Sequence, residues 1–425
     1  MMAPDVLERQ LTDFLADAAT PREVDLADVY AKTRSMTQRH VWTSPAAWRS
    51  TLTMRPASQG RRSLSALLLV GLMVGALIAV TLVTGSRRQL PPPVGPARAG
   101  LFAFSTQRGI YVMQPDGTGR TLLVSGVRKQ VGPAWSPDGT RLAYWSEMDS
   151  VRQFSLHVLD LDDSTSTPMA GGRQFYVSDP FYVSEPAVWS PDGKRLAFTT
   201  TTGELRLVNS DGSNLQRIGD PAMRFGTPTW SPDGTWIAVR VELEPGTYRG
   251  YVIHPDGTRQ TAITAPYAVG ESHMGFGWSP DGRSVVYHVS VPTDYDIAIS
   301  RLDASGAWRQ ETLLDGANND VLPAWSNDGT RIAFIRTENA GTPGQFSRLM
   351  TATASGADPK VISDRPVDRY VPCWSPDDRS IGVGSYSTED LLPVVDLVAV
   401  DGSGVVEIHE PGGASSSCAW QRLAP

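Results

Sequence analysis

Histidine is the residue type in this sequence best suited to acid–base or metal chemistry, but its positions form no catalytic or metal-binding motif. Five histidines follow residue 100, at His157, His254, His273, His288 and His409. Structural and catalytic zinc sites pair ligands at short, fixed spacings, and these residues are too far apart for that. The sequence therefore predicts no metal and no cofactor, although a fold that gathers distant segments around one axis could still bring several histidines together.

A nucleophile motif is also missing from the sequence. No Gly-x-Ser-x-Gly elbow occurs, and Gly402-Ser403-Gly404 has the composition of a turn. Two cysteines, Cys373 and Cys418, precede tryptophans by one and two residues. That offset puts them on opposite faces of their strands if the flanking segments align, which favours two buried thiols over a disulfide. From these observations we predict that the protein is not an enzyme.

Aromatic, basic and amide side chains gather in segments of variable length between the predicted strands, the longest being Gly171 to Pro186. Binding residues are normally found on variable loops carried by a rigid scaffold. Aromatic rings could instead plug the mouth of a channel. The candidate ligand-binding residues are Arg173, Tyr176, Phe181, Tyr182, Arg224, Phe225, Tyr267, His273, Asn319, Asp320, Arg369 and Tyr370.

The elements that position these residues are repeats. The letters WSPDG begin at Trp135, Trp189, Trp230 and Trp278, followed by WSNDG from Trp325 and WSPDD from Trp374; Trp420 stands in a seventh, divergent copy. Successive tryptophans are 54, 41, 48, 47, 49 and 46 residues apart. A period of this size, with an aromatic strand and glycine turns in each unit, is typical of a β-propeller.

Each repeat predicts four antiparallel strands. Proline, aspartate and glycine in the WSPDG unit favour a tight hairpin turn, and short strands follow it, such as those beginning at Leu142 and Leu196. We therefore interpret the repeat residues as structural: Trp135, Trp189, Trp230, Trp278, Trp325, Trp374 and Trp420, with Asp138, Asp192, Asp233, Asp281, Asp328 and Asp377. Asn327 replaces proline and Asp378 replaces glycine, so the last two hairpins should be less rigid.

These repeats resemble the TolB-like propeller, which is built from WD40-like repeats with the signature WSPDG. The resemblance covers about residues 100 to 421. It implies an all-β propeller of four-stranded blades. It does not imply the role of TolB proteins in the envelope, because nothing here resembles their separate amino-terminal domain. The body also resembles the non-catalytic half of prolyl oligopeptidase-like enzymes, but only five residues follow Trp420.

Seven blades are predicted from the strands themselves. A strand of the type that follows each WSPDG turn also begins at Leu101, before the first tryptophan, and Trp420 lies in a tryptophan strand without a unit after it. The last strand should therefore complete the first blade, which removes free sheet edges. A six-bladed ring with one irregular unit is the alternative.

A transmembrane helix is predicted at residues 63–86. The segment contains no charge, is almost wholly apolar from Leu64 to Thr84, and is flanked by Arg61, Arg62, Arg87 and Arg88. About 20 apolar residues span a bilayer, and no signal-peptide cleavage site is evident. The slight excess of arginine on the amino side predicts a cytoplasmic amino end and an extracytoplasmic propeller. Gly71 and Gly75 form a GxxxG pair that would allow a homodimer.

The predicted domains are a cytoplasmic, partly disordered helical segment at 1–62, the span at 63–86, a proline-rich linker at 87–99 and the propeller at 100–425. The propeller contains 38 acidic and 26 basic residues, which disfavours nucleic acid as a partner. Segment 1–62 has one histidine, His40, and no cysteine, so it lacks the ligands of a zinc-binding anti-sigma factor.

The sequence thus predicts a single-pass membrane protein whose extracytoplasmic propeller binds or scaffolds a protein or small ligand. Two alternatives stay open. One is a transmembrane signalling protein with an anti-sigma-like amino segment. The other is a carbohydrate-active enzyme, lyase-like, that uses the axial pocket.

Overall fold

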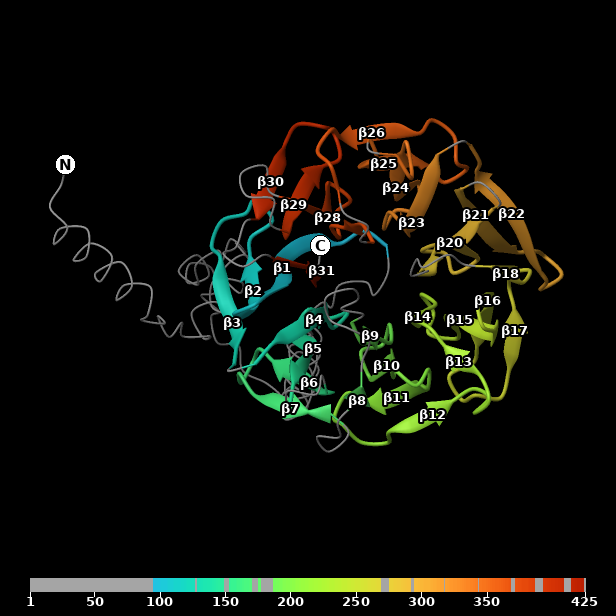
Figure 1. The fold of residues 1–425 in the computed structure, drawn as a ribbon. Helices are drawn as coiled ribbons and strands as arrows, with labels where there is room; N and C mark the ends of the chain where they lie inside the picture. The colour runs from blue at the N-terminus through green and yellow to red at the C-terminus, as the bar shows by residue number, and fades with distance from the viewer. Residues whose placement is uncertain are drawn as a thin grey trace, which may run out of the picture. The chain divides into compact units, whose positions relative to one another are not determined.

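The computed structural model describes residues 95–423, apart from 127, 149–152, 170–174, 177–185, 269–274, 292–293, 317, 343, 368–370, 387–392 and 409–413. These residues form thirty-one β-strands, arranged as a ring of seven sheets around a central axis (Figure 1). The predicted segments 1–62 and 63–86 and the Gly71–Gly75 pair lie outside the described residues. In the part that is described, no helix is long and apolar enough to cross a membrane.

Each sheet is one antiparallel blade whose strands follow one another outward from the axis. Blade 1 consists of β31 (Ala414–Leu423), β1 (Arg98–Thr106), β2 (Gly109–Met113) and β3 (Thr121–Ser125). Blade 2 consists of β4 (Gln130–Trp135), β5 (Arg141–Glu147), β6 (Gln153–Asp160) and β7 (Ser166–Pro168), and blade 3 of β9 (Val188–Trp189), β10 (Arg195–Thr199), β11 (Leu205–Asn209) and β12 (Gln216–Ile218). Blade 4 consists of β14 (Thr229–Trp230), β15 (Ile237–Glu244), β16 (Thr247–Ile253) and β17 (Gln260–Ala262).

The other three blades follow the same order. Blade 5 consists of β19 (Gly277–Trp278), β20 (Ser284–Ser290), β21 (Tyr295–Leu302) and β22 (Trp308–Leu314), and blade 6 of β23 (Asn319–Trp325), β24 (Arg331–Glu338), β25 (Phe346–Thr353) and β26 (Lys360–Ser363). Blade 7 consists of β27 (Cys373–Trp374), β28 (Ser380–Tyr386), β29 (Pro393–Ala399) and β30 (Val405–Ile408). The prediction of seven four-stranded blades is confirmed.

The last strand closes the ring, as the sequence predicts. β31 pairs with β1 in antiparallel register, with Phe102 opposite Trp420 and Ala103 opposite Ala419. The innermost strand of blade 1 therefore comes from the carboxyl end of the chain, and its other three strands come from the start of the propeller. This arrangement pairs the edge that each terminal segment would otherwise leave open.

Three short strands occupy segments that the sequence predicts to be loops. β8 (Phe175–Tyr176) pairs with β6, β13 (Arg224–Phe225) with β15, and β18 (Tyr267–Ala268) with β16. Blades 2 and 4 are thereby extended at the end away from the WSPDG turns. The loop expectation is wrong at these positions because the long second and third strands offer unpaired backbone groups there, which two further residues can satisfy.

The hydrophobic core lies between neighbouring blades. One cluster joins Trp145 and Phe154 of blade 2 to Leu196 and Phe198 of blade 3, and the rings of Trp145 and Phe198 meet edge to face with centroids 5.4 Å apart. Another cluster joins Phe102 and Phe104 of blade 1 to blade 7. Each sheet buries both faces, so the strands are rich in apolar residues rather than strictly alternating.

Candidate functional site

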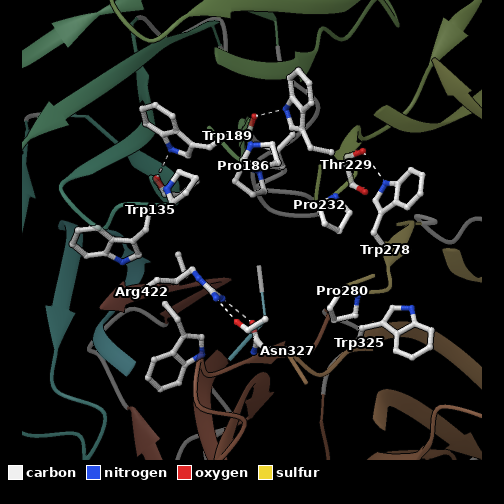
Figure 2. A pocket seen from close by; sticks show the side chains of 18 of the residues that line it. Trp135, Pro186, Trp189, Thr229, Pro232, Trp278, Pro280, Trp325, Asn327 and Arg422 are labelled. Carbon is white, nitrogen blue, oxygen red and sulfur yellow. Dashed lines mark hydrogen bonds between the residues drawn. The ribbon is translucent and has the colours of Figure 1, made fainter. Parts of the chain in front are cut away.

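The innermost strands enclose an axial cavity of about 530 Å³ (Figure 2). The residues that line it include six of the seven repeat tryptophans and six prolines. Arg422 is the one charged residue among the described residues that line it. The lining is thus mostly apolar, and its polar side chains are those of Thr229, Ser326, Asn327 and Arg422.

The tryptophan side chains join each blade to the one before it. Five indole nitrogens donate a hydrogen bond to the backbone carbonyl that directly precedes the previous repeat tryptophan. These pairs are Trp189 to Ala134 (3.0 Å), Trp230 to Val188 (3.2 Å), Trp278 to Thr229 (3.2 Å), Trp374 to Ala324 (3.0 Å) and Trp420 to Cys373 (3.3 Å). Figure 2 shows the rings pointing away from the axis, between the blades. We call these contacts the tryptophan latches.

Two latches are missing. The indole nitrogens of Trp135 and Trp325 are buried and have no hydrogen-bond partner in the part of the chain that the structure describes. Trp135 is as buried as its bonded counterparts, at 8% exposed. Trp278 and Trp325, by contrast, are both partly exposed.

The aspartate of each turn organises the hairpin. In the first repeat, Ser136 Oγ and the backbone N–H of Thr140 donate to Asp138 Oδ1 at 2.5 and 3.1 Å. Burial by itself would raise the pKa of Asp138, but these hydrogen bonds and the nearby Arg141 lower it below its ordinary value. Arg141 also stacks over Trp189 of the next blade at 4.8 Å. The turn and the following blade are therefore held together by one short segment.

The residue two positions after each repeat tryptophan is proline in five blades and Asn327 and Arg422 in the other two. Asp378, in the glycine position of the next turn, has φ +58°. Its carboxylate accepts hydrogen bonds from Asn327 N and Nδ2 at 2.7 and 2.9 Å and from Asp328 N at 2.9 Å. The two departures from the repeat thus bond each other, which proline could not do because it has no N–H. The expectation of less rigid hairpins overlooked this pairing.

Arg422 completes this group at the axis. Its Nη1 donates to Asn327 Oδ1 at 2.8 Å and its Nη2 to the carbonyl of Gly95 (Figure 2). Burial lowers the pKa of Arg422 from its ordinary value, while Asp378 opposes that shift. Guanidinium keeps its charge at neutral pH even when buried. Arg422 was not among the predicted site residues because Trp420 lies in a divergent copy of the repeat. Alignment of Arg422 with the prolines of WSPDG would have placed it at the axis.

The predicted rim residues that the structure describes are mostly built into the blades. Phe225 is 4% exposed and packs with Trp230, while Arg224 is exposed and pairs with Glu242 at 3.3 Å. Tyr267 is partly buried, and burial raises its pKa well above the ordinary value. For Tyr176 only the strand position is described. Arg173, Phe181, Tyr182, His273, Arg369 and Tyr370 lie outside the described residues.

Asn319 and Asp320 are also buried rather than exposed at a rim. Asn319 Oδ1 accepts the backbone N–H of Tyr295 at 3.2 Å. Asp320 is 3% exposed and accepts two hydrogen bonds of 2.7 Å from Arg336. Burial nevertheless raises the pKa of Asp320. The ion pair of Asp320 and Arg336 joins β23 to β24 within blade 6. The Asp320 carboxylate is therefore used inside the blade and is not exposed at a rim.

The histidines are distributed among different blades. His157 belongs to β6, His288 to β20, and His254 follows β16. Within the described residues no group of three His, Cys, Asp or Glu side chains could hold a metal ion. His157 instead contacts Ser155 Oγ at 2.7 Å through Nε2, and burial lowers its pKa.

The expectation of two free thiols is wrong, because Cys373 is disulfide-bonded. The sequence contains one other cysteine, Cys418 on β31. Trp374 and Trp420 each face the preceding blade, as their latches show. Cys373, adjacent to Trp374 on β27, then faces the following blade, blade 1, to which β31 belongs. The prediction compared the strand faces of the two cysteines without allowing for their places in two neighbouring blades.

The sequence is similar to three named bacterial proteins. It is 29% identical over 233 residues to the uncharacterized peptidase YuxL of Bacillus subtilis, which covers 52% of this chain and 32% of YuxL. It is 28% identical to the uncharacterized protein Atu1656 of Agrobacterium fabrum (54% of this chain, 77% of that protein) and 25% identical to dipeptidyl-peptidase 5 of Porphyromonas gingivalis (64% and 40%). The match thus spans only about a third of the length of the two peptidases.

The prediction that the protein is not an enzyme is contradicted by these relatives, two of which are named peptidases. That prediction rested on the lack of a nucleophile motif in this sequence. The lack of such a motif does not separate the chain from the peptidases, since the similarity covers only part of their length.

Solved structures share the fold. The TM-score is 0.50 with TolB from Acinetobacter baumannii (15% identity, 76% of this chain and 66% of that chain), 0.51 with the tricorn protease (12%; 77% and 36%) and 0.52 with a prolyl endopeptidase (15%; 75% and 50%). At these identities the likeness shows the fold alone. The family model of the TolB beta propeller domain (PD40) matches residues 148–424, and the chain belongs to that family.

Proposed function

We propose that the propeller binds a peptide in its axial channel and recognises a terminal carboxylate with Arg422. The observation that carries this proposal is the 530 Å³ apolar cavity with one guanidinium in its lining. Pockets of this kind bind ligands through apolar walls and orient them through a few polar groups. A guanidinium binds a carboxylate in a planar, two-pronged geometry.

Peptide is the ligand class that the relatives favour. YuxL and dipeptidyl-peptidase 5 are named for action on peptides. Tryptophan and proline edges suit the apolar side chains of a peptide. Residues 100–425 contain 38 acidic and 26 basic residues, so the propeller as a whole repels anions. Arg422 is then a local site that attracts them.

The proposal also places the propeller outside the cytoplasm, anchored by residues 63–86 with the amino end inside. The disulfide bond of Cys373 supports an oxidising compartment. The uncharged, arginine-flanked segment 63–86 supports a membrane anchor.

Calorimetric titration of the full-length protein with acetyl-Ala-Leu-Leu, as the free acid and as the carboxyl-terminal amide, tests the ligand class. Hydrogen bonds to a charged partner contribute about 1.5–3 kcal/mol, so the free acid should bind at least tenfold more tightly than the amide. Equal affinities of the two peptides, or no binding of either, would contradict recognition of a peptide carboxylate.

A further inference from the structure

The first described residues of the chain cross the edge of the axial cavity. Gly95 is among the residues that line it, and its carbonyl accepts a hydrogen bond from Nη2 of Arg422. Two residues later, the backbone N–H of Ala97 donates to the carbonyl of Pro376 in blade 7 at 2.7 Å. β1 begins directly afterwards, at Arg98. We call residues 95–97 the entry strap.

The entry strap lies at the inner end of blade 7. In the other six blades, the residue two positions after the repeat tryptophan lines the cavity: Pro137, Pro191, Pro232, Pro280, Asn327 and Arg422. Its counterpart in blade 7, Pro376, is buried and is not among the described lining residues. Ala97, which is bonded to Pro376, is 7% exposed, and Gly95 lines the cavity. The strap therefore supplies a part of the wall that blade 7 does not.

Few contacts hold the start of the strap. Gly95 has φ +80°, and a Cβ added to it would meet no described atom within 4 Å beyond its chain neighbours. Pro96 is exposed, and as a proline it has no N–H to donate. Among the described residues, the hydrogen bond from Arg422 is the one that ties Gly95 to the blades. Exchange of this one bond would release the start of the strap and leave the blades unchanged.

A carboxylate would compete for the guanidinium that holds the strap. Nη1 of Arg422 donates to Asn327 Oδ1 at 2.8 Å (Figure 2) and Nη2 donates to Gly95, so both acceptors are neutral oxygens. A carboxylate offers two oxygens in the plane of the guanidinium fork together with a full opposite charge. It is therefore a stronger acceptor for Arg422 than the Gly95 carbonyl.

We propose that the entry strap is an autoinhibitory contact, in which the Gly95 carbonyl occupies the anion site of Arg422 until a carboxylate displaces it. The inference rests on the proposed function for the chemistry of the ligand. The hydrogen bond from Nη2 passes to the ligand, and residues 95 and 96 leave the cavity wall while β1 stays paired with β31. Only molecules with a released strap are competent to bind, so the strap lowers the apparent affinity of the site.

Gly95→Ala weakens the strap without changing Arg422. A residue with a Cβ resists the left-handed conformation of Gly95. Calorimetric titration of the full-length variant should therefore show about fivefold tighter binding of acetyl-Ala-Leu-Leu free acid than the parent shows, and no gain for the amide. Gly246→Ala is the matched control, because Gly246 has φ +81°, is exposed and has no described atom near an added Cβ. This control should bind both peptides like the parent.

The displacement itself can be followed at the Gly95 carbonyl. Glycine directly precedes proline at two places, Gly95–Pro96 and Gly132–Pro133. Full-length protein labelled with ¹³C-carbonyl glycine and ¹⁵N-proline therefore gives two carbon–nitrogen correlations, and Gly95→Ala identifies the one from Gly95. Saturating free acid should shift this correlation because the carbonyl loses the guanidinium. The amide should leave it in place.

Three outcomes would overturn the inference. They are equal affinity of Gly95→Ala and the parent for the free acid, an equal gain for the amide, and an unmoved Gly95 correlation at saturating free acid. If the parent prefers the free acid tenfold in any of these cases, the Arg422 proposal stands and the strap alone is rejected. If neither protein binds the free acid, the proposed function and the inference fail together.

Discussion

At the scale of single residues, the two positions that depart from the repeat act together. Asn327 donates to the Asp378 carboxylate through both its backbone and its side chain, and Asp378 takes a left-handed conformation that the other turns assign to glycine. At another junction the equivalent positions are Pro280 and Gly329, where a Cβ added to the glycine would lie 3.4 Å from Pro280 Cδ. A change at one position should matter less when the other is changed as well.

We predict that Asn327→Pro alone lowers the free energy of unfolding by about 1–3 kcal/mol, because it removes donors from a carboxylate that is 7% exposed. In the Asp378→Gly background the same substitution should cost less, with a coupling of about 0.5–3 kcal/mol. Denaturant unfolding of the parent protein, the two single variants and the double variant measures this coupling. Both variants that carry Asn327→Pro also lose the hydrogen bond from Arg422 to residue 327. That loss is common to the two and therefore cancels in the double-mutant cycle. Strictly additive losses would show that the two residues do not interact.

At the scale of secondary-structure elements, the tryptophan latches hold neighbouring inner strands together. Trp189 and Trp135 form a matched pair, since both are 8% exposed, but only Trp189 has a hydrogen-bond partner, the carbonyl of Ala134. This difference isolates the hydrogen bond from the burial of the indole.

We predict that Trp189→Phe destabilises the protein by about 1 kcal/mol more than Trp135→Phe does, because it alone breaks a formed hydrogen bond. Phenylalanine keeps an aromatic ring beneath Arg141 in the first variant, which limits the loss of cation–π contact. Thermal or urea unfolding of both variants provides the comparison. If the two losses were equal, or Trp135→Phe were the worse, the latches would not contribute as described.

The strands and the ring could be predicted from sequence because each repeat carries its own turn and strand signals. The aromatic strand, the WSPDG turn and the closing strand at Trp420 all recur at a steady period. The short strands β8, β13 and β18 could not be predicted, since their pairing depends on unsatisfied groups in distant strands. The disulfide of Cys373 was missed because the faces that meet belong to different blades.

The site was harder to predict than the fold. Variable loop length and aromatic content favoured the rim, yet Phe225, Asn319 and Asp320 are buried within blades. Arg422 lies in a divergent copy of the repeat, so its place at the axis follows from alignment with the prolines of WSPDG together with ring closure, which sets the carboxyl-terminal strand innermost. Propeller geometry gives the innermost strand of every blade access to one shared channel, so residues far apart in sequence become neighbours there.

At the scale of the whole protein, the proposed membrane topology makes a direct prediction. A protease added to intact cells should digest residues 100–425 while residues 1–62 remain protected, because the arginine distribution around 63–86 favours a cytoplasmic amino end. Antibodies against tags at the two ends would follow each part. Protection of the propeller, or digestion of the amino segment in unbroken cells, would reject this topology.

The measurement that tests the central claim most directly is the effect of Arg422→Gln on the affinity difference between the free-acid and amidated forms of acetyl-Ala-Leu-Leu. Arg422 is the one charged residue among those described in the channel lining, so the variant should lose the preference for the free acid while binding the amide as before. Arg309→Gln, whose side chain is 75% exposed, should keep the full preference. If Arg422→Gln retained the tenfold preference for the free acid, the carboxylate would be recognised elsewhere and the account of the channel would be wrong.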